Sequence, residues 1–235
     1  MRRLRVLVVL VIVTATLALA LPVGAATGVV AEAHRARTTT CSSAYFDGDS
    51  RLGPQQLPNA GPIAPIVRGY HRFAGLTEQE FLTTYWDPTA NGGSGGWRYP
   101  PDNGFLLDPG GTPIEFSWSL QVGQEIDRFG SEFGAFLAPE DTPYAERALP
   151  PQSLDDVDPA FTCNYHLYRV VKPFTVEAGP IAPGFRQRGL GLQFQLVASL
   201  LPGTTATANV VWLLNNGYLQ RMTPGQCGDY PDCRE

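Results

Sequence analysis

The chain contains little basic charge and almost no lysine. Lys172 is the one lysine among 17 basic residues, and 22 acidic residues give a formal net charge of −5. A general nucleic-acid-binding protein needs a basic face, so this composition argues against a nucleic-acid partner. A site for anions must therefore be local and built from a few arginines, whose guanidinium groups suit bidentate contacts with phosphate.

Signatures of several enzyme classes are missing as well. The sequence contains no Walker motif and no H-E-x-x-H. Residues 92–96 fit G-x-S-x-G, but a nucleophile elbow needs a strand before the serine and a helix after it, and this serine lies in a glycine-rich loop. Gly189-Leu190-Gly191 begins like a dinucleotide fingerprint, but Phe194 stands at the third glycine and no helix is expected after it. These enzyme classes are therefore disfavoured.

Long apolar runs are absent except at the N-terminus. Three of the first five residues are arginine, residues 6–21 are almost all apolar, and small residues follow at Val23 and Ala25. This pattern predicts a secretory signal peptide over residues 1–25. An uncleaved membrane anchor is the alternative, because a spanning helix needs ~20 apolar residues. We expect a secreted or cell-surface protein with no membrane segment after cleavage, and a disordered leader over residues 26–40.

Cysteine is scarce but even in number. The four cysteines are Cys41, Cys163, Cys227 and Cys233, which in an exported chain predicts two disulfides. Three pairings are open, and the spacing does not choose among them. A zinc site is a poor alternative, because five residues separate the last two cysteines and no histidine lies near them.

The chain is rich in turn-forming residues, with 25 glycines and 21 prolines, which predicts short elements joined by many loops. Thr77 and Glu80 form a capping box that starts a helix over residues 78 to about 86. A segment rich in Gly, Asn and Pro follows. We interpret it as the boundary between a small N-terminal module of helix and loops (41–100) and the main domain (101–235).

Beyond this boundary the apolar period becomes two. Apolar residues at 114, 116, 118 and 120 alternate with polar ones, which predicts a half-buried strand. Asn216-Gly217 predicts a hairpin turn between two later strands, and Thr142 and Pro143 predict the start of a short helix. The expected fold class is α+β and mostly β, with small helices. Further strands are expected at residues 125–129, 133–137, 165–171, 174–177, 192–198, 210–214 and 218–222.

Three polar side chains stand where apolar alternation would expose them. They are Arg128 near a strand end, Arg147 on the short helix, and Gln193 opposite the apolar face of its strand. Each has an ordinary explanation: a surface ion pair of Arg128 with Asp127 or Glu132, a helix-end arginine, and a solvated strand residue. One at a time, none of them predicts a site.

As a group, however, the segments around these residues resemble the tuberculosis necrotizing toxin domain family. The blocks occur in the family's order over about residues 105–200. The part from 45 to 86 resembles the N-terminal module of the secreted fungal surface NADases that carry this domain. The matching segments are D-R-F-G-S-E-F-G-A-F-L (127–137), T-P-Y (142–144), R-A-L-P-P (147–151), Y-H-L-Y (165–168), G-P-I-A-P (179–183) and G-L-G-L-Q-F (189–194).

The resemblance implies an enzyme that hydrolyses NAD and NADP to nicotinamide and ADP-ribose, in a domain of antiparallel strands with short helices. Bacterial members of the family are toxins, and fungal members lie on or leave the cell surface. It implies no required cofactor and, by analogy with the fungal enzymes, allows a homodimer. Calcium bound by the acidic residues at 155–158 and 229–232 is an alternative to ordinary solvated charge. By position, the catalytic residues are Arg128, Arg147 and Gln193, and the substrate-binding residues are Phe129, Phe136, Tyr144 and His166.

The chemistry of NAD cleavage suits these residue types. Two arginines answer the two negative charges of the pyrophosphate, and aromatic rings offer their faces to the bases. Nicotinamide leaves as a neutral amine, so the general acid of ordinary glycoside hydrolysis is unnecessary. We expect Gln193 to orient the ribose or the attacking water through its amide. The alternatives are an ADP-ribosyl cyclase or transferase that uses the same cleft, and a non-catalytic secreted surface module.

Overall fold

A computed structural model describes residues 36–204 and 208–225. The expected signal peptide, most of the expected leader, and both Cys227 and Cys233 lie outside these ranges. From residue 36 onward the described chain belongs to one compact unit, in which Thr38 and Asn59 exchange hydrogen bonds. Within the described ranges, no helix has the length and apolar character needed to cross a membrane. The expected boundary near residue 100 stays a prediction.

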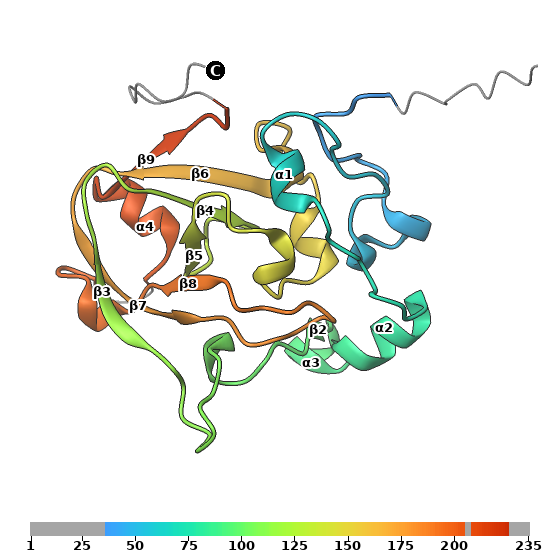
Figure 1. Cartoon of the computed structure of the whole chain (residues 1–235), viewed down its shortest axis with the longest axis horizontal. Coiled ribbons are helices and arrows are strands. Elements are labelled where there is room, and N and C mark those ends of the chain that lie inside the picture. Colours follow the sequence, from blue (N-terminus) through green and yellow to red (C-terminus); the bar gives the residue numbers. More distant parts are fainter. Residues whose placement is uncertain (1–35, 205–207, 226–235) are drawn as a thin grey trace, which may run out of the picture. The chain divides into compact units, whose positions relative to one another are not determined.

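The main element is an antiparallel sheet of seven strands in the order β3-β7-β8-β5-β4-β6-β9 (Figure 1). Every pair of neighbours in it is antiparallel, which confirms the expected α+β, mostly β class. β5 begins at Phe136 rather than 133, because a turn at residues 131–134 precedes it. The strands are β3 (Phe116–Leu120), β4 (Glu125–Phe129), β5 (Phe136–Pro139), β6 (Tyr165–Val170), β7 (Phe174–Pro180), β8 (Leu192–Gln195) and β9 (Leu219–Met222).

The α-helices are short. The helix α2 (Glu78–Tyr85) starts with the expected capping box: the Thr77 hydroxyl accepts from the backbone N–H of Glu80, and the Glu80 carboxylate accepts from the backbone N–H of Thr77. This confirms the best-signalled helix in the sequence. The other helices are α1 (Ile63–Val67), α3 (Ala90–Gly93) and α4 (Val210–Asn215), and a two-stranded sheet pairs β1 (Trp86–Asp87) with β2 (Gly96–Trp97).

The helix expected after Pro143 is a single 3₁₀ turn, Tyr144–Glu146. The hydroxyl of Thr142 donates to the carbonyl of Pro139 and does not cap the turn. The remaining 3₁₀ turns cover Phe46–Gly48, Ser50–Leu52, Asp102–Gly104, Pro151–Leu154, Thr162–Asn164 and Ala198–Leu200.

The strand expected at residues 210–214 is instead the helix α4, and this expectation was wrong. Asn209 caps the helix by accepting a hydrogen bond of 2.8 Å from the backbone N–H of Trp212. Asn216-Gly217 ends the helix and does not form a hairpin turn, with Gly217 at a φ of 68°. A short apolar run has the same pattern in a buried strand and in a helix buried on one side, so the cap and the glycine were the informative residues.

The expected apolar face of β3 is only partly covered. Leu120 is 1% exposed, but Phe116 and Trp118 are 45% and 44% exposed. β3 is an edge strand with β7 as its one neighbour in the sheet, so the outer part of this face stays open.

Two apolar clusters cover opposite faces of the sheet. Ile126 and Tyr168 are register partners in the first cluster, whereas Phe129 and Tyr165 are partners in the second. Because successive side chains of a strand point to opposite faces, the two clusters lie on either side of β4 and β6. Residues of α4 belong to the first cluster and residues of α1 to the second. The end of β4 is therefore held from both sides.

A disulfide joins Cys41 to Cys163, with Cα atoms 5.1 Å apart. It connects the start of the described chain to the 3₁₀ turn before β6, across 122 residues of sequence. Both sulfur-bearing residues are buried beside α1 in the second cluster. Of the three pairings that the sequence left open, this bond fits the one that joins Cys41 to Cys163.

We predict that the double variant Cys41→Ser, Cys163→Ser lowers the free energy of unfolding by about 2–5 kcal/mol, because the unfolded chain loses a long cross-link. Urea unfolding followed by tryptophan fluorescence measures this loss. The exposed neighbour Ser43 supplies a matched control, Ser43→Ala. An unchanged urea midpoint in the double variant would contradict the prediction.

Candidate active site

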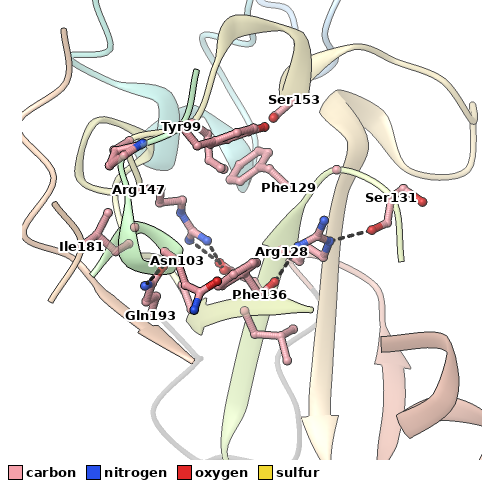
Figure 2. Close-up of a pocket in the computed structure, with 18 residues that line it drawn as sticks. Tyr99, Asn103, Arg128, Phe129, Ser131, Phe136, Arg147, Ser153, Ile181 and Gln193 are labelled. Carbon is pink, nitrogen blue, oxygen red and sulfur yellow. Dashed lines mark hydrogen bonds and ion pairs between the residues drawn. The ribbon is translucent and has the colours of Figure 1, made fainter. Parts of the chain in front are cut away.

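A cavity of about 650 Å³ lies at the C-terminal end of β4, bordered by β5, β8 and the loop at residues 99–104 (Figure 2). Its size is typical of sites for small molecules and cofactors. The cavity brings together five of the seven site residues predicted from the sequence and leaves out Tyr144 and His166. The five are Arg128, Phe129, Phe136, Arg147 and Gln193.

Among the described residues, Arg128 is held by main-chain carbonyls and forms no ion pair with a carboxylate. Its Nε donates to the carbonyl of Ser131 and its Nη1 to the carbonyl of Phe136, each at 2.7 Å. Asp127 and Glu132, the two partners considered from the sequence, form ion pairs with other arginines. Burial lowers the pKa of Arg128, but a guanidinium stays protonated in proteins. Within the described ranges, Arg128 therefore brings to the cavity wall a positive charge that is not paired with a carboxylate.

Arg147 forms a buried ion pair with Asp127. Its Nη2 lies 2.8 Å from one carboxylate oxygen, its Nη1 contacts the other, and its Nε donates to the carbonyl of Thr142 at 2.8 Å. The Tyr165 hydroxyl donates to the same carboxylate at 2.9 Å, and the guanidinium lies 5.2 Å from the ring centre of Phe129. Burial raises the pKa of Asp127, while Arg147 and the Tyr165 hydroxyl oppose this rise. The charge of Arg147 is thus balanced where it stands.

The two arginines consequently differ in kind. The charged residues that line the cavity are Asp127, Arg128 and Arg147. The charges of Asp127 and Arg147 cancel because the two side chains form an ion pair. The charge of Arg128 remains, which suits one anionic group in an otherwise acidic protein.

Gln193 on β8 is buried, and its amide is oriented by the loop across the cavity. Its Nε2 donates to the carbonyl of Asn103 at 3.1 Å. Within the described residues, no hydrogen bond reaches its Oε1. Figure 2 shows Gln193 and Asn103 on one side of the cavity and Arg128 with Ser131 on the other. The arrangement leaves a carbonyl acceptor for a bound hydroxyl group or water.

The predicted aromatic residues lie in different surroundings. Phe136 is half-buried and lines the cavity, whereas Phe129 is 2% exposed and packs edge-on against Tyr144. Tyr144 is fully buried and donates its hydroxyl to the carbonyl of Pro150. Of the three, Phe136 alone presents a partly open ring to the cavity.

His166 lies directly opposite Arg128 in the register of β4 and β6, but outside the cavity lining. Its Nδ1 is 3.5 Å from the carboxylate of Glu132, its Nε2 is 3.1 Å from the Asn164 side chain, and its ring lies against Phe161. Burial lowers the pKa of His166 although Glu132 opposes the change. Burial thus favours the neutral imidazole, which lies beside the cavity and does not line it.

The sequence did not single out the loop that closes the cavity. Tyr99 is 55% exposed, and its ring meets the ring of Phe185 at 5.2 Å between centres. Phe185 in turn contacts Tyr85 of α2 and Trp97 of β2. Neither periodicity nor a motif marks these loop residues, and an aromatic residue directly before two prolines, at Tyr99, is the one local signal. The other lining residues outside the predicted set include Asn103, Ser131, Ser153 and Ile181.

The described part of the chain holds no cluster of three or more His, Cys, Asp or Glu side chains that could bind a metal ion. Asp155 and Asp156 are included in that search, whereas residues 229–232 lie outside the described ranges.

Residues 119–222 match the family described as tuberculosis necrotizing toxin. The chain is also 43% identical over 187 residues to the conidial surface nicotinamide adenine dinucleotide glycohydrolase nadA of Aspergillus fumigatus, covering 80% of this chain and 75% of that protein. Among solved structures, tuberculosis necrotizing toxin complexed with its immunity factor matches at a TM-score of 0.48 and 21% identity, over 75% of this chain and 79% of the other. Rhs1-CT in complex with its cognate immunity protein matches at a TM-score of 0.30 and 14% identity, over 48% of this chain and 80% of the other.

The identity to the Aspergillus protein extends well beyond the segment that matches the family, and takes in most of both chains. On this relationship, the chain belongs to the tuberculosis necrotizing toxin family.

Proposed function

We infer that this chain is an NAD glycohydrolase, which cleaves the bond between nicotinamide and ribose. The observation that carries the inference is the 43% identity to a protein named as such an enzyme, over 80% of this chain. The cavity supports it, because it joins an uncompensated arginine, an open aromatic ring and a free amide carbonyl in one space. The products are nicotinamide and ADP-ribose.

Arg128 is suited to hold the diphosphate. Its guanidinium is fixed by two carbonyls and is not neutralised by a carboxylate, so it offers both charge and donors to phosphate oxygens. Arg147 is paired with Asp127, so it offers N–H donors at a fixed position but no net charge. The two predicted arginines thereby take unequal roles in the same site.

Gln193 is suited to act at the ribose. Because its Nε2 is committed to Asn103, its Oε1 is available to accept from a ribose hydroxyl or from the attacking water. Nicotinamide departs as a neutral amine, so the site needs no general acid. What it supplies is orientation and a preorganised dipole beside the developing oxocarbenium charge.

The open faces of Phe136 and Tyr99 are suited to the two bases of the dinucleotide. Phe129 borders the cavity but is packed between Tyr144 and the guanidinium of Arg147, and Tyr144 and His166 lie outside the lining. Tyr99 belongs to the loop before residue 119, so the segment that precedes the family match contributes to binding.

The finer expectations extend this proposal. Secretion through a signal peptide over residues 1–25 agrees with the surface location named for the Aspergillus relative and with the Cys41–Cys163 disulfide. Use of NADP beside NAD, a toxic role and a homodimer follow from the family resemblance.

We predict that the purified mature protein converts NAD to nicotinamide and ADP-ribose in equal amounts, without added metal or cofactor. Chromatography of the products measures this outcome directly. Cyclic ADP-ribose as the main product would replace the proposal with a cyclase, and intact NAD at micromolar enzyme would favour a non-catalytic surface protein.

We predict that Gln193→Ala lowers kcat by roughly 30- to 1000-fold, since a single preorganised polar group contributes about 2–4 kcal/mol to the transition state. Steady-state release of nicotinamide measures the effect. Gln195→Ala is the matched control, because Gln195 lies on the same strand but does not line the cavity. Equal activity of the two folded variants would remove Gln193 from the mechanism.

We predict that Tyr99→Ala raises KM for NAD by about tenfold or more, whereas Tyr99→Phe stays near wild type, because stacking of a base on an aromatic ring is worth about 1–3 kcal/mol. Tyr45→Ala, at an exposed tyrosine outside the cavity, controls for general effects. A KM for Tyr99→Ala equal to that of the control would show that the ring does not bind substrate.

A further inference from the structure

Arg128 is held in a fixed position at the cavity, and this position depends on the residue at 134. The two carbonyls that accept from it belong to Ser131 and Phe136, which lie on either side of Gly134. The guanidinium plane thus lies against the short stretch of backbone between the turn and β5.

Gly134 leaves the space that the guanidinium fills. A Cβ atom built on Gly134 would overlap Nη2 and Cζ of Arg128 and would lie 2.7 Å from Nη1. Non-bonded heavy atoms attract best at about 3.5–4.0 Å, so even the methyl group of alanine cannot share this space. Any side chain at 134 requires either the guanidinium or the backbone to move.

The backbone is not free to move. The N–H of Gly134 donates to the carbonyl of Ser131 at 3.0 Å, and its own carbonyl accepts from the N–H of Val210 at 3.2 Å, at the start of α4. The carbonyl of Glu132 also accepts from this first turn of α4. The turn is therefore fixed from both directions, and the guanidinium is the part that yields.

Backbone conformation does not explain the glycine. Gly130, four residues earlier, has a φ of 99° and is favoured there on conformational grounds. Gly134 has an ordinary φ that other residues adopt. The missing side chain at 134 is explained by Arg128 and not by the turn.

We propose that Gly134 is a positioning residue for the substrate: it allows the guanidinium of Arg128 to lie against the backbone and so presents its charge to the diphosphate of the dinucleotide. The proposal rests on the proposed function for its substrate, and on geometry for the contact. It assigns the glycine of the segment 131–137 the role of leaving room for a side chain that binds substrate.

A double-mutant cycle tests this role. Gly134→Ala should raise KM for NAD by about tenfold or more with a smaller change in kcat, because a contact made equally in the ground and transition states affects KM. Combined with Arg128→Ala, which removes the obstructed side chain, Gly134→Ala should change KM by less than about twofold. Such non-additivity is expected for groups that are in contact or structurally coupled and not for independent sites.

Thermal unfolding provides a second readout that does not depend on catalysis. Gly134→Ala should lower the melting temperature in the presence of Arg128 and should not lower it further in Arg128→Ala. Gly110→Ala is the matched control, because Gly110 also has an ordinary φ and its Cβ would meet only the side chain of Asp108, at 3.2 Å. A Gly134→Ala protein that folds only when combined with Arg128→Ala would support the same contact.

The outcomes separate the two proposals. A wild-type protein without NAD cleavage would contradict the proposed function, while the melting cycle would still decide whether Gly134 accommodates the guanidinium. If cleavage is normal and Arg128→Ala raises KM, but Gly134→Ala behaves like Gly110→Ala in both readouts, the positioning role is wrong. A wild-type KM in Arg128→Ala would overturn the binding role of the arginine and the glycine together.

Discussion

The ion pair of Asp127 with Arg147 is the interaction on which the cavity depends. It links β4 to the segment after the 3₁₀ turn at 144–146, and it adds the Thr142 carbonyl and the Tyr165 hydroxyl as further partners. Charges this deeply buried are stable only as a fully bonded group, and removing one partner of such a pair typically costs about 3–5 kcal/mol. The network therefore fixes the spacing of strand and loop at the floor of the cavity.

Because Asp127 neutralises Arg147, Arg128 becomes the source of positive charge in the cavity. A protein with a formal charge of −5 cannot attract an anion through its overall field, and two free guanidinium groups side by side would repel each other. With Arg147 paired, Arg128 alone supplies the charge, held by carbonyls that orient it without cancelling it. A rigid donor of this kind binds with little loss of side-chain entropy, because its rotamer is already fixed.

The wall of the cavity that lies opposite Arg128 includes residues from the loop at 99–104 (Figure 2). Asn103 orients Gln193, and Tyr99 is supported through Phe185 by the aromatic side chains of α2 and β2. These contacts join the N-terminal segment to the sheet near the place where the ribose and a base are expected to bind. The part of the chain before residue 119 thus supplies one wall of the cavity, and the matched segment supplies the other.

The sequence alone predicted the elements with local causes, which are the capping box of α2 and the alternation of most strands. Its motif blocks also predicted a site for which the structure brings Arg128, Phe129, Phe136, Arg147 and Gln193 to one cavity. The strand predicted at residues 210–214 was wrong, because a short apolar run is equally compatible with strand and helix. The sequence also did not indicate Tyr99 or Asn103, because no periodic pattern or motif includes them. Only the tertiary structure decided that Arg147 is paired, that Arg128 has no carboxylate partner among the described residues, and that Gly134 faces a guanidinium. Charge pairing and close packing depend on contacts between residues that are distant in sequence or brought together by a turn.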